Sequence, residues 1–267
     1  MKPYLSGCLL LLSLGLSVGN LHAQTNGAKL AKILHSKELR VCIWPDYYGI
    51  SFRNPKSKSL SGLDIDISAA LAQELGVTLR YVDSSFPQLI DKLLNDECDI
   101  AMHAVGVTPA RAAKLQFTQA YLRSDMYAVI SKNSNAVQNW DDLDKPGRII
   151  AVQNGTVMVA VMQAKIKQAK LLLVSAPMTR EQEVESGRAD AFMTDYPYSR
   201  RVLASTDWAR IIAPPRPYNL TDYAYAIAPG DPIFLARLNR FVAEIKKNGR
   251  LAAFASKHQL DAIALSQ

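Results

Sequence analysis

The chain has 267 residues, of which 49% are apolar and 21% are charged, and its net charge at pH 7 is +7. This balance is typical of a globular protein that is long enough to bury one large core or two modest ones. The basic residues are spread among acidic ones rather than gathered with aromatic residues into a block, so we do not expect the protein to bind nucleic acid.

The first residues have the features of a cleaved export signal. Lys2 precedes an apolar run from Leu9 to Val18, and the tripeptide Leu21-His22-Ala23 fits a small-residue cleavage site. We therefore predict a signal peptide over residues 1–23. The apolar run is too short to span a bilayer as a helix, and no later segment is long and apolar enough to do so.

The next part of the chain alternates strands and helices. The pattern predicts a strand at 39–44, a helix from 62 to the helix-ending Gly76, a strand at 77–82, a helix opened by a capping box at 85–88 and running to 94, and a strand at 100–107 followed by a helix from 109. This βαβαβα order predicts an α/β unit with a parallel sheet that is covered on both faces.

The alternation then starts again. We predict strands at 127–131, 148–153, 171–175, 189–194 and 223–228, a helical turn at 141–143, and helices at 157–169, 179–187, 196–203, 232–247 and 251–258. The second α/β unit is therefore nested inside the first. We place one discontinuous lobe at 24–124 and 222–267 and an inserted lobe at 125–221, with two crossings between them.

The exported chain keeps two cysteines, Cys42 and Cys98, and both fall on predicted strands. If these strands are neighbours, a disulfide is possible in an oxidising compartment and would contribute about 2–4 kcal/mol. The alternative is two separate buried thiols. The cysteines and the scattered histidines have no metal-ligand spacing, so we expect neither a metal nor another cofactor.

Polar residues follow the ends of several predicted strands, where open α/β sheets bind ligands. Arg111 lies in the first turn of a helix that Thr108 caps, where a cation is unfavourable by roughly 0.3–1 kcal/mol. We therefore interpret Arg111 as a residue that binds a carboxylate. Thr156 and the backbone N–H groups at its helix start could hold the same carboxylate. Asp195 would then receive an ammonium group. The alternatives are a solvated Arg111 and residues that merely cap helices.

Aromatic residues follow two of these strands, and together with the clamp they describe a pocket for an α-amino acid. Trp44, Tyr47 and Phe86 would form the wall against the ligand side chain, although Trp44 and Phe86 are also compatible with ordinary core positions. His103, at the end of a third strand, is better placed to line the pocket or the core than to act as a catalyst.

Several motifs give the chain a family resemblance. They are Gly62-Leu63-Asp64-Ile65-Asp66-Ile67, Cys98-Asp99-Ile100, Thr108 to Arg111 with Phe117-Thr118, Val152 to Thr156, and Gly187 to Ala191 ahead of Asp195. With these the chain resembles the bacterial periplasmic solute-binding proteins of family 3, the amino-acid-binding components of ABC importers. The resemblance implies a type II periplasmic-binding-protein fold of two lobes with a two-strand hinge. It also implies a periplasmic monomer that is not an enzyme and that delivers an amino acid to an ABC permease in the inner membrane.

The resemblance also assigns the binding residues. It implies that Arg111 and Thr156 bind the ligand carboxylate, that Asp195 binds the amine, and that Tyr47 and Phe86 hold the side chain. The whole implied set is Trp44, Tyr47, Phe86, His103, Ala104, Gly106, Arg111, Gln153, Thr156, Met158 and Asp195. Trp44 replaces an acid found in members that bind cationic side chains, so we expect an uncharged or aromatic amino acid rather than a strongly cationic one.

Two other functions remain open. The fold also includes periplasmic cyclohexadienyl dehydratases, in which case Asp195, Asp46 or His103 would serve as the general acid. Some accessory proteins of quinoprotein alcohol oxidation share the pairing of an Arg-Val-Cys strand with a later Cys-Asp strand. The retained Arg111 and Asp195 favour a free amino acid instead.

Overall fold

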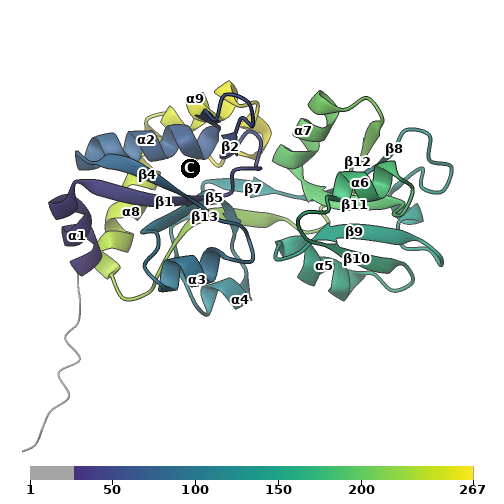
Figure 1. Cartoon of the computed structure of the whole chain (residues 1–267), viewed down its shortest axis with the longest axis horizontal. Helices are drawn as coiled ribbons and strands as arrows, with labels where there is room; N and C mark the ends of the chain where they lie inside the picture. The colour runs from purple at the N-terminus through teal and green to yellow at the C-terminus, as the bar shows by residue number, and fades with distance from the viewer. Residues whose placement is uncertain (1–26, 267) are drawn as a thin grey trace, which may run out of the picture.

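The computed structural model describes residues 27–266, so the predicted signal peptide at 1–23 lies outside the described residues. The chain forms two α/β lobes that lie side by side along the long axis of the molecule (Figure 1). This is the two-lobed type II fold expected from the sequence. In the described residues, no helix has the length and apolar character needed to cross a membrane.

The first lobe is built on a sheet with the order β4-β1-β5-β13-β6, and β7 pairs with β13. Its strands are β1 (Glu38–Ile43), β4 (Thr78–Asp83), β5 (Ile100–Gly106), β6 (Gln116–Phe117), β7 (Leu122–Ser124) and β13 (Thr221–Ile227), and a separate hairpin pairs β2 (Phe52–Arg53) with β3 (Leu60–Ser61). Its helices are α1 (Ala28–Ser36), α2 (Leu63–Leu75), α3 (Leu89–Leu94), α4 (Pro109–Ala112), α8 (Pro232–Lys247) and α9 (Arg250–Lys257), with the turn η2 (Asp261–Ile263). In Figure 1, α2 and α9 lie on one side of this sheet and α3 and α4 on the other.

The second lobe has a sheet with the order β10-β9-β11-β8-β12. Its strands are β8 (Met126–Ser131), β9 (Ile149–Gln153), β10 (Lys170–Val174), β11 (Ala191–Asp195) and β12 (Ala209–Ile212), and its helices are α5 (Val157–Lys165), α6 (Arg180–Glu185) and α7 (Tyr196–Ser205), with the turn η1 (Trp140–Asp142). The second lobe has a buried apolar cluster of its own, and a larger cluster continues from the first lobe into the second.

The chain passes between the lobes at Asp125 and returns just before Thr221. β7 ends at Ser124 beside Thr221 of β13 in the first sheet, whereas β8 begins at Met126 in the second. The carboxylate of Asp125 accepts backbone N–H groups from both passes, at 2.8 Å from Met126 and 2.7 Å from Asn219. One side chain therefore ties the outgoing and returning segments together.

Three details of the predicted elements are wrong. The sheets are mixed rather than parallel, because β13 and β8 run antiparallel to β5 and β11. The helix expected from Ser85 begins at Leu89, since the Ser85 hydroxyl bonds the Gln88 side-chain oxygen at 3.1 Å instead of capping the backbone. The helix expected to reach 169 ends at Lys165, because Ile166 is already extended.

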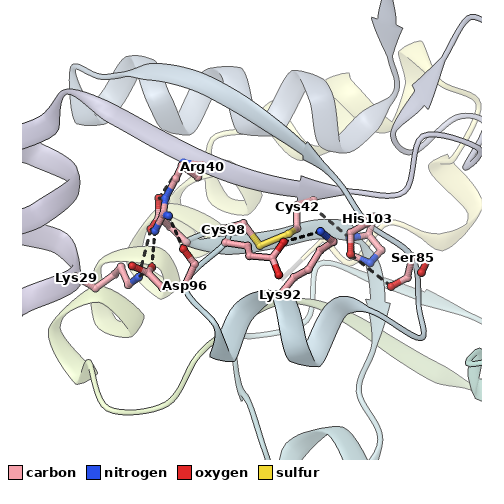
Figure 2. The surroundings of a disulfide bond; sticks show 11 residues. Lys29, Arg40, Cys42, Ser85, Lys92, Asp96, Cys98 and His103 are labelled. Carbon is pink, nitrogen blue, oxygen red and sulfur yellow. Dashed lines mark hydrogen bonds and ion pairs between the residues drawn. A yellow bond between two sulfur atoms is a disulfide. The ribbon is translucent and has the colours of Figure 1, made fainter.

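Cys42 and Cys98 form a disulfide that joins β1 to the segment that leads into β5 (Figure 2). Both cysteines are fully buried, in a cluster that includes Leu89 of α3 and Val105 of β5. Of the two sequence-based alternatives, the bridge is therefore the one observed. Both bridged cysteines belong to the first lobe, so the disulfide does not link the two lobes.

Replacing both bridged cysteines by serine should lower the free energy of unfolding by about 2–4 kcal/mol, because the cross-link closes a long loop in the unfolded chain. Urea unfolding of wild type and Cys42→Ser/Cys98→Ser measures the difference, and a reductant should destabilise the wild type alone. Two free thiols in the unfolded, unreduced wild type would contradict the bridge.

Asp64 is a buried carboxyl group at the start of α2. Its Oδ2 accepts the Tyr121 hydroxyl at 2.7 Å and the Ala104 backbone N–H at 2.8 Å, and its Oδ1 accepts the Tyr225 hydroxyl at 3.1 Å. Burial raises the pKa of Asp64 to about 6, although these three hydrogen bonds favour the charged form. The group therefore titrates higher in the folded protein than in the unfolded chain.

This shift predicts a pH-dependent stability. Below about pH 4 the carboxyl group of Asp64 is protonated in both the folded and the unfolded state. Between about pH 4 and 6 it ionises in the unfolded chain first, so the folded state binds more protons. The folded state therefore loses stability as the pH rises through this range. The free energy of unfolding of Asp64→Asn minus that of wild type should therefore increase by about 2–3 kcal/mol from pH 4 to pH 7. Urea titrations at several pH values measure this; a constant difference would contradict the shift.

Candidate functional site

A small cavity, with a volume of about 20 Å³, lies between the lobes, at the ends of strands from both sheets. Its wall is formed by Trp44, Tyr47, Phe86, Ala104, Gly106, Arg111, Thr156, Val157, Met158, Arg180, Thr194, Asp195, Tyr198 and Tyr223. Most residues of the predicted binding set are therefore brought together here. Their binding roles stay predictions.

Arg111 is positioned by the short helix α4. The Thr108 hydroxyl accepts the Arg111 backbone N–H at 3.2 Å, and Pro109 occupies the first helical position, as the sequence predicts. The Arg111 side chain is only 7% exposed and its guanidinium lies 5.4 Å from the centre of the Phe86 ring. Burial lowers its pKa to about 10, so it is still protonated at neutral pH.

The guanidinium of Arg111 reaches across the cleft. Nη1 donates to the Gly106 carbonyl at 2.8 Å in its own lobe, and Nη2 donates to the Gly155 carbonyl at 3.0 Å in the other. Within residues 27–266 it has no carboxylate partner. Because a guanidinium has five N–H donors, this buried cation retains donors for an anion.

Asp195 ends β11 and caps α7, with its Oδ1 accepting the Tyr198 backbone N–H at 3.2 Å. Its Oδ2 accepts the Tyr223 hydroxyl at 2.8 Å and also the Tyr47 hydroxyl, which comes from the other lobe. Burial, and then the negative charge of Asp195, raise the pKa values of both tyrosines, so the two hydroxyls stay protonated and donate. Most of the hydrogen-bonding capacity of this carboxylate is thus already used.

Gly155 and Thr156 lie at the start of α5, where the lobes touch. The Thr156 hydroxyl donates to the Gln153 carbonyl at 2.7 Å, so in this state it holds its own turn rather than facing the cavity as a free donor. Gly155 has a φ of +75°, and a Cβ there would lie 2.6 Å from the Pro87 ring of the first lobe. Only glycine fits this close approach.

Aromatic rings form one side of the cavity. The Trp44 ring centre lies 5.2 Å from those of Tyr47 and Phe86, and 6.3 Å from that of Tyr198, against which it stacks. The predicted aromatic wall is therefore present, and Tyr198 extends it into the second lobe. Tyr47 differs from the expected side-chain holder because its hydroxyl is bonded to Asp195.

Two predicted residues do not line this cavity. His103 lies behind Phe86, where its Nδ1 is 3.3 Å from the Cys42 carbonyl oxygen (Figure 2). Burial lowers the pKa of His103 to about 3, so at neutral pH it has no extra proton to give as a general acid. Gln153 instead lines an adjacent groove that shares Trp44 and Tyr198 with the cavity.

The sequence analysis missed Arg180, Tyr198 and Tyr223 as cavity residues. Arg180 is the first residue of α6, after the Thr179 cap, and is 3% exposed. A cation in the first turn of a helix is the signal that singled out Arg111, and it was equally visible here. Tyr223 gave no comparable signal, because its partner Asp195 is distant in the chain.

Two lobes that enclose a cavity lined by charged and aromatic residues define a cleft-binding protein of the type II fold. Residues 39–261 match the bacterial extracellular solute-binding proteins, family 3, and the chain belongs to that family.

Individual relatives have different activities. Cyclohexadienyl dehydratase of Pseudomonas aeruginosa is 28% identical over 229 residues, covering 85% of this chain and 85% of that protein. The L-cystine-binding protein of Escherichia coli is 23% identical over 229 residues, again with 85% of each covered. The crystal structure of an ancestral amino acid-binding protein, a precursor of cyclohexadienyl dehydratase, is similar with a TM-score of 0.77 at 31% identity, covering 85% of this chain and 98% of that one.

The contact between Gly155 and Pro87 predicts a variant that closes poorly. Gly155→Ala places a methyl group 2.6 Å from the Pro87 ring, closer than atoms can pack, so we expect a larger radius of gyration in small-angle X-ray scattering than for wild type. Gly147→Ala is the matched control, because Gly147 has a similar φ of +82° with no neighbour within 4 Å. Equal radii for both variants would contradict a role of this contact in closure.

Proposed function

We propose that the protein captures a small, amino-acid-like carboxylate between its lobes in the periplasm and delivers it to an ABC importer. The observation that carries this proposal is the buried Arg111 guanidinium, which touches both lobes and has no carboxylate partner within residues 27–266. A desolvated cation is costly unless an anion accompanies it. The amino-acid-binding relatives support the same class of ligand.

In this proposal the ligand carboxylate lies against the free N–H donors of Arg111, in the bidentate geometry that arginine favours. Thr156 contributes by rotating its hydroxyl away from the Gln153 carbonyl, or by its position at the start of α5. An amine on the ligand would reach Asp195 only by sharing the oxygens that Tyr47 and Tyr223 already occupy. The carboxylate contact is therefore the stronger part of the site.

Replacing Arg111 by alanine should weaken ligand binding strongly while the protein still folds. A thermal-shift screen of amino acids and organic acids gives the wild-type ligand, since a ligand that binds only the folded state raises the melting temperature. Loss of charge-assisted hydrogen bonds should weaken that ligand on the order of 10- to 100-fold or more. Arg123→Ala is the control, because Arg123 pairs with Asp222 on the surface. Unchanged affinity in Arg111→Ala would contradict the proposal.

A second candidate function is an enzyme that acts in the same cavity. The similarity to cyclohexadienyl dehydratase favours it, and so does the burial of Asp195 beside two protonated tyrosines, which could relay a proton. Incubation with a cyclohexadienyl substrate separates the two functions: product formation that Asp195→Asn abolishes would establish the enzyme, and stoichiometric binding without turnover would support the binding protein.

A further inference from the structure

A second buried arginine lies in the wall of the same cavity. The Arg180 guanidinium is 4.4 Å from the centre of the Tyr198 ring and 5.2 Å from that of Phe192. Its Nη1 donates to the Met193 carbonyl at 2.8 Å, and its buried Nε has no hydrogen-bond partner among residues 27–266. Arg180 thus has most of its donors unused at a site that largely excludes water.

The acidic groups around Arg180 are engaged elsewhere. Asp195 accepts hydroxyls from Tyr47 and Tyr223, and Glu181 accepts the Tyr198 hydroxyl. In the described part of the chain, Arg180 forms no ion pair. The cavity wall therefore contains two buried cations, Arg111 and Arg180, and a single buried carboxylate that faces tyrosines.

The two guanidiniums are connected by a row of rings. Arg111 lies over Phe86, Phe86 contacts Trp44, Trp44 stacks on Tyr198, and Arg180 lies over Tyr198. This row of rings follows one side of the cavity from the first lobe to the second. A ligand along this wall would meet a cation at each end and an apolar surface between them.

We propose that the ligand is a small dicarboxylate, with one carboxylate at Arg111, the second at Arg180 and the connecting carbon atoms against Trp44. This assignment rests on the proposed capture of a carboxylate at Arg111 and adds the second charge. The class contains acidic amino acids and dicarboxylic acids without an amine. Because tyrosines already satisfy Asp195, an amine is not required. A cationic side chain would face two buried cations and is disfavoured.

Matched pairs of compounds test the second charge. We would titrate the whole exported chain by calorimetry with succinate and its monoamide succinamate, and with L-glutamate and its monoamide L-glutamine. The wild type should bind one diacid of these pairs on the order of 10- to 100-fold more tightly than its monoamide, as expected for a charge-assisted contact. Comparison of succinate with glutamate separates an amine-free ligand from an amino acid.

Variants assign the discrimination to Arg180. Arg180→Gln should bind the diacid as weakly as the monoamide, while its affinity for the monoamide changes little, and Arg180→Lys should restore part of the preference. Arg201→Gln is the matched control. Arg201 also lies over Tyr198, at 5.3 Å, but it lines the adjacent groove that contains Gln153 rather than the cavity. It should keep the preference for the diacid. Circular dichroism and thermal unfolding show that each variant is folded.

The outcomes are distinct. Monoamides that bind the wild type as tightly as the diacids would overturn the assignment of Arg180 and leave the capture of a carboxylate standing. The assignment of Arg180 would also be overturned if folded Arg180→Gln and Arg180→Lys each lost affinity for the diacid and the monoamide equally. In that case Arg180 would act only through the shape of the cavity. A wild type that binds none of these compounds but binds another carboxylate in the thermal-shift screen would overturn the dicarboxylate assignment alone. A wild type that binds no carboxylate in either experiment would contradict the proposed capture itself.

Discussion

The contact of Arg111 with the Gly155 carbonyl is the interaction on which the closed cleft depends. It buries a guanidinium between two lobes and places its remaining donors toward the cavity. The other contacts across the cleft surround it: Tyr47 bonds Asp195, Trp44 stacks on Tyr198, and Pro87 packs against Gly155. Each joins a residue of one lobe to a residue of the other, so the same set of contacts both closes the protein and shapes the cavity.

A buried carboxyl group in the first lobe fixes the backbone that forms part of the cavity wall. Ala104 lines the cavity although its φ of +48° is uncommon for alanine, and its N–H points to the buried Asp64. Tyr121 and Tyr225 donate to the same carboxylate. The floor of the site is therefore set by a polar group inside the core rather than by apolar packing alone.

Local signals predicted much of this architecture from the sequence. Thr108 with Pro109 places Arg111, the Thr179 box starts α6, and the amphipathic helix α8 has the expected bounds. The misses have a common cause, because they depend on contacts between distant residues. The antiparallel β13 and the burial of His103 behind Phe86 arise from pairings between distant segments of the first lobe, and the tyrosine pair on Asp195 arises only when both lobes are assembled.

The second lobe is an insertion in the first, and the two segments that join the lobes lie together at Asp125. The chain leaves at Asp125 and returns by Asn219, and a single carboxylate holds both segments. A unit with adjacent ends and its own core can be exchanged as a block, since replacing it disturbs only a few backbone bonds of the host. A substitution confined to the inserted lobe can therefore alter one half of the site while the host lobe keeps its own half.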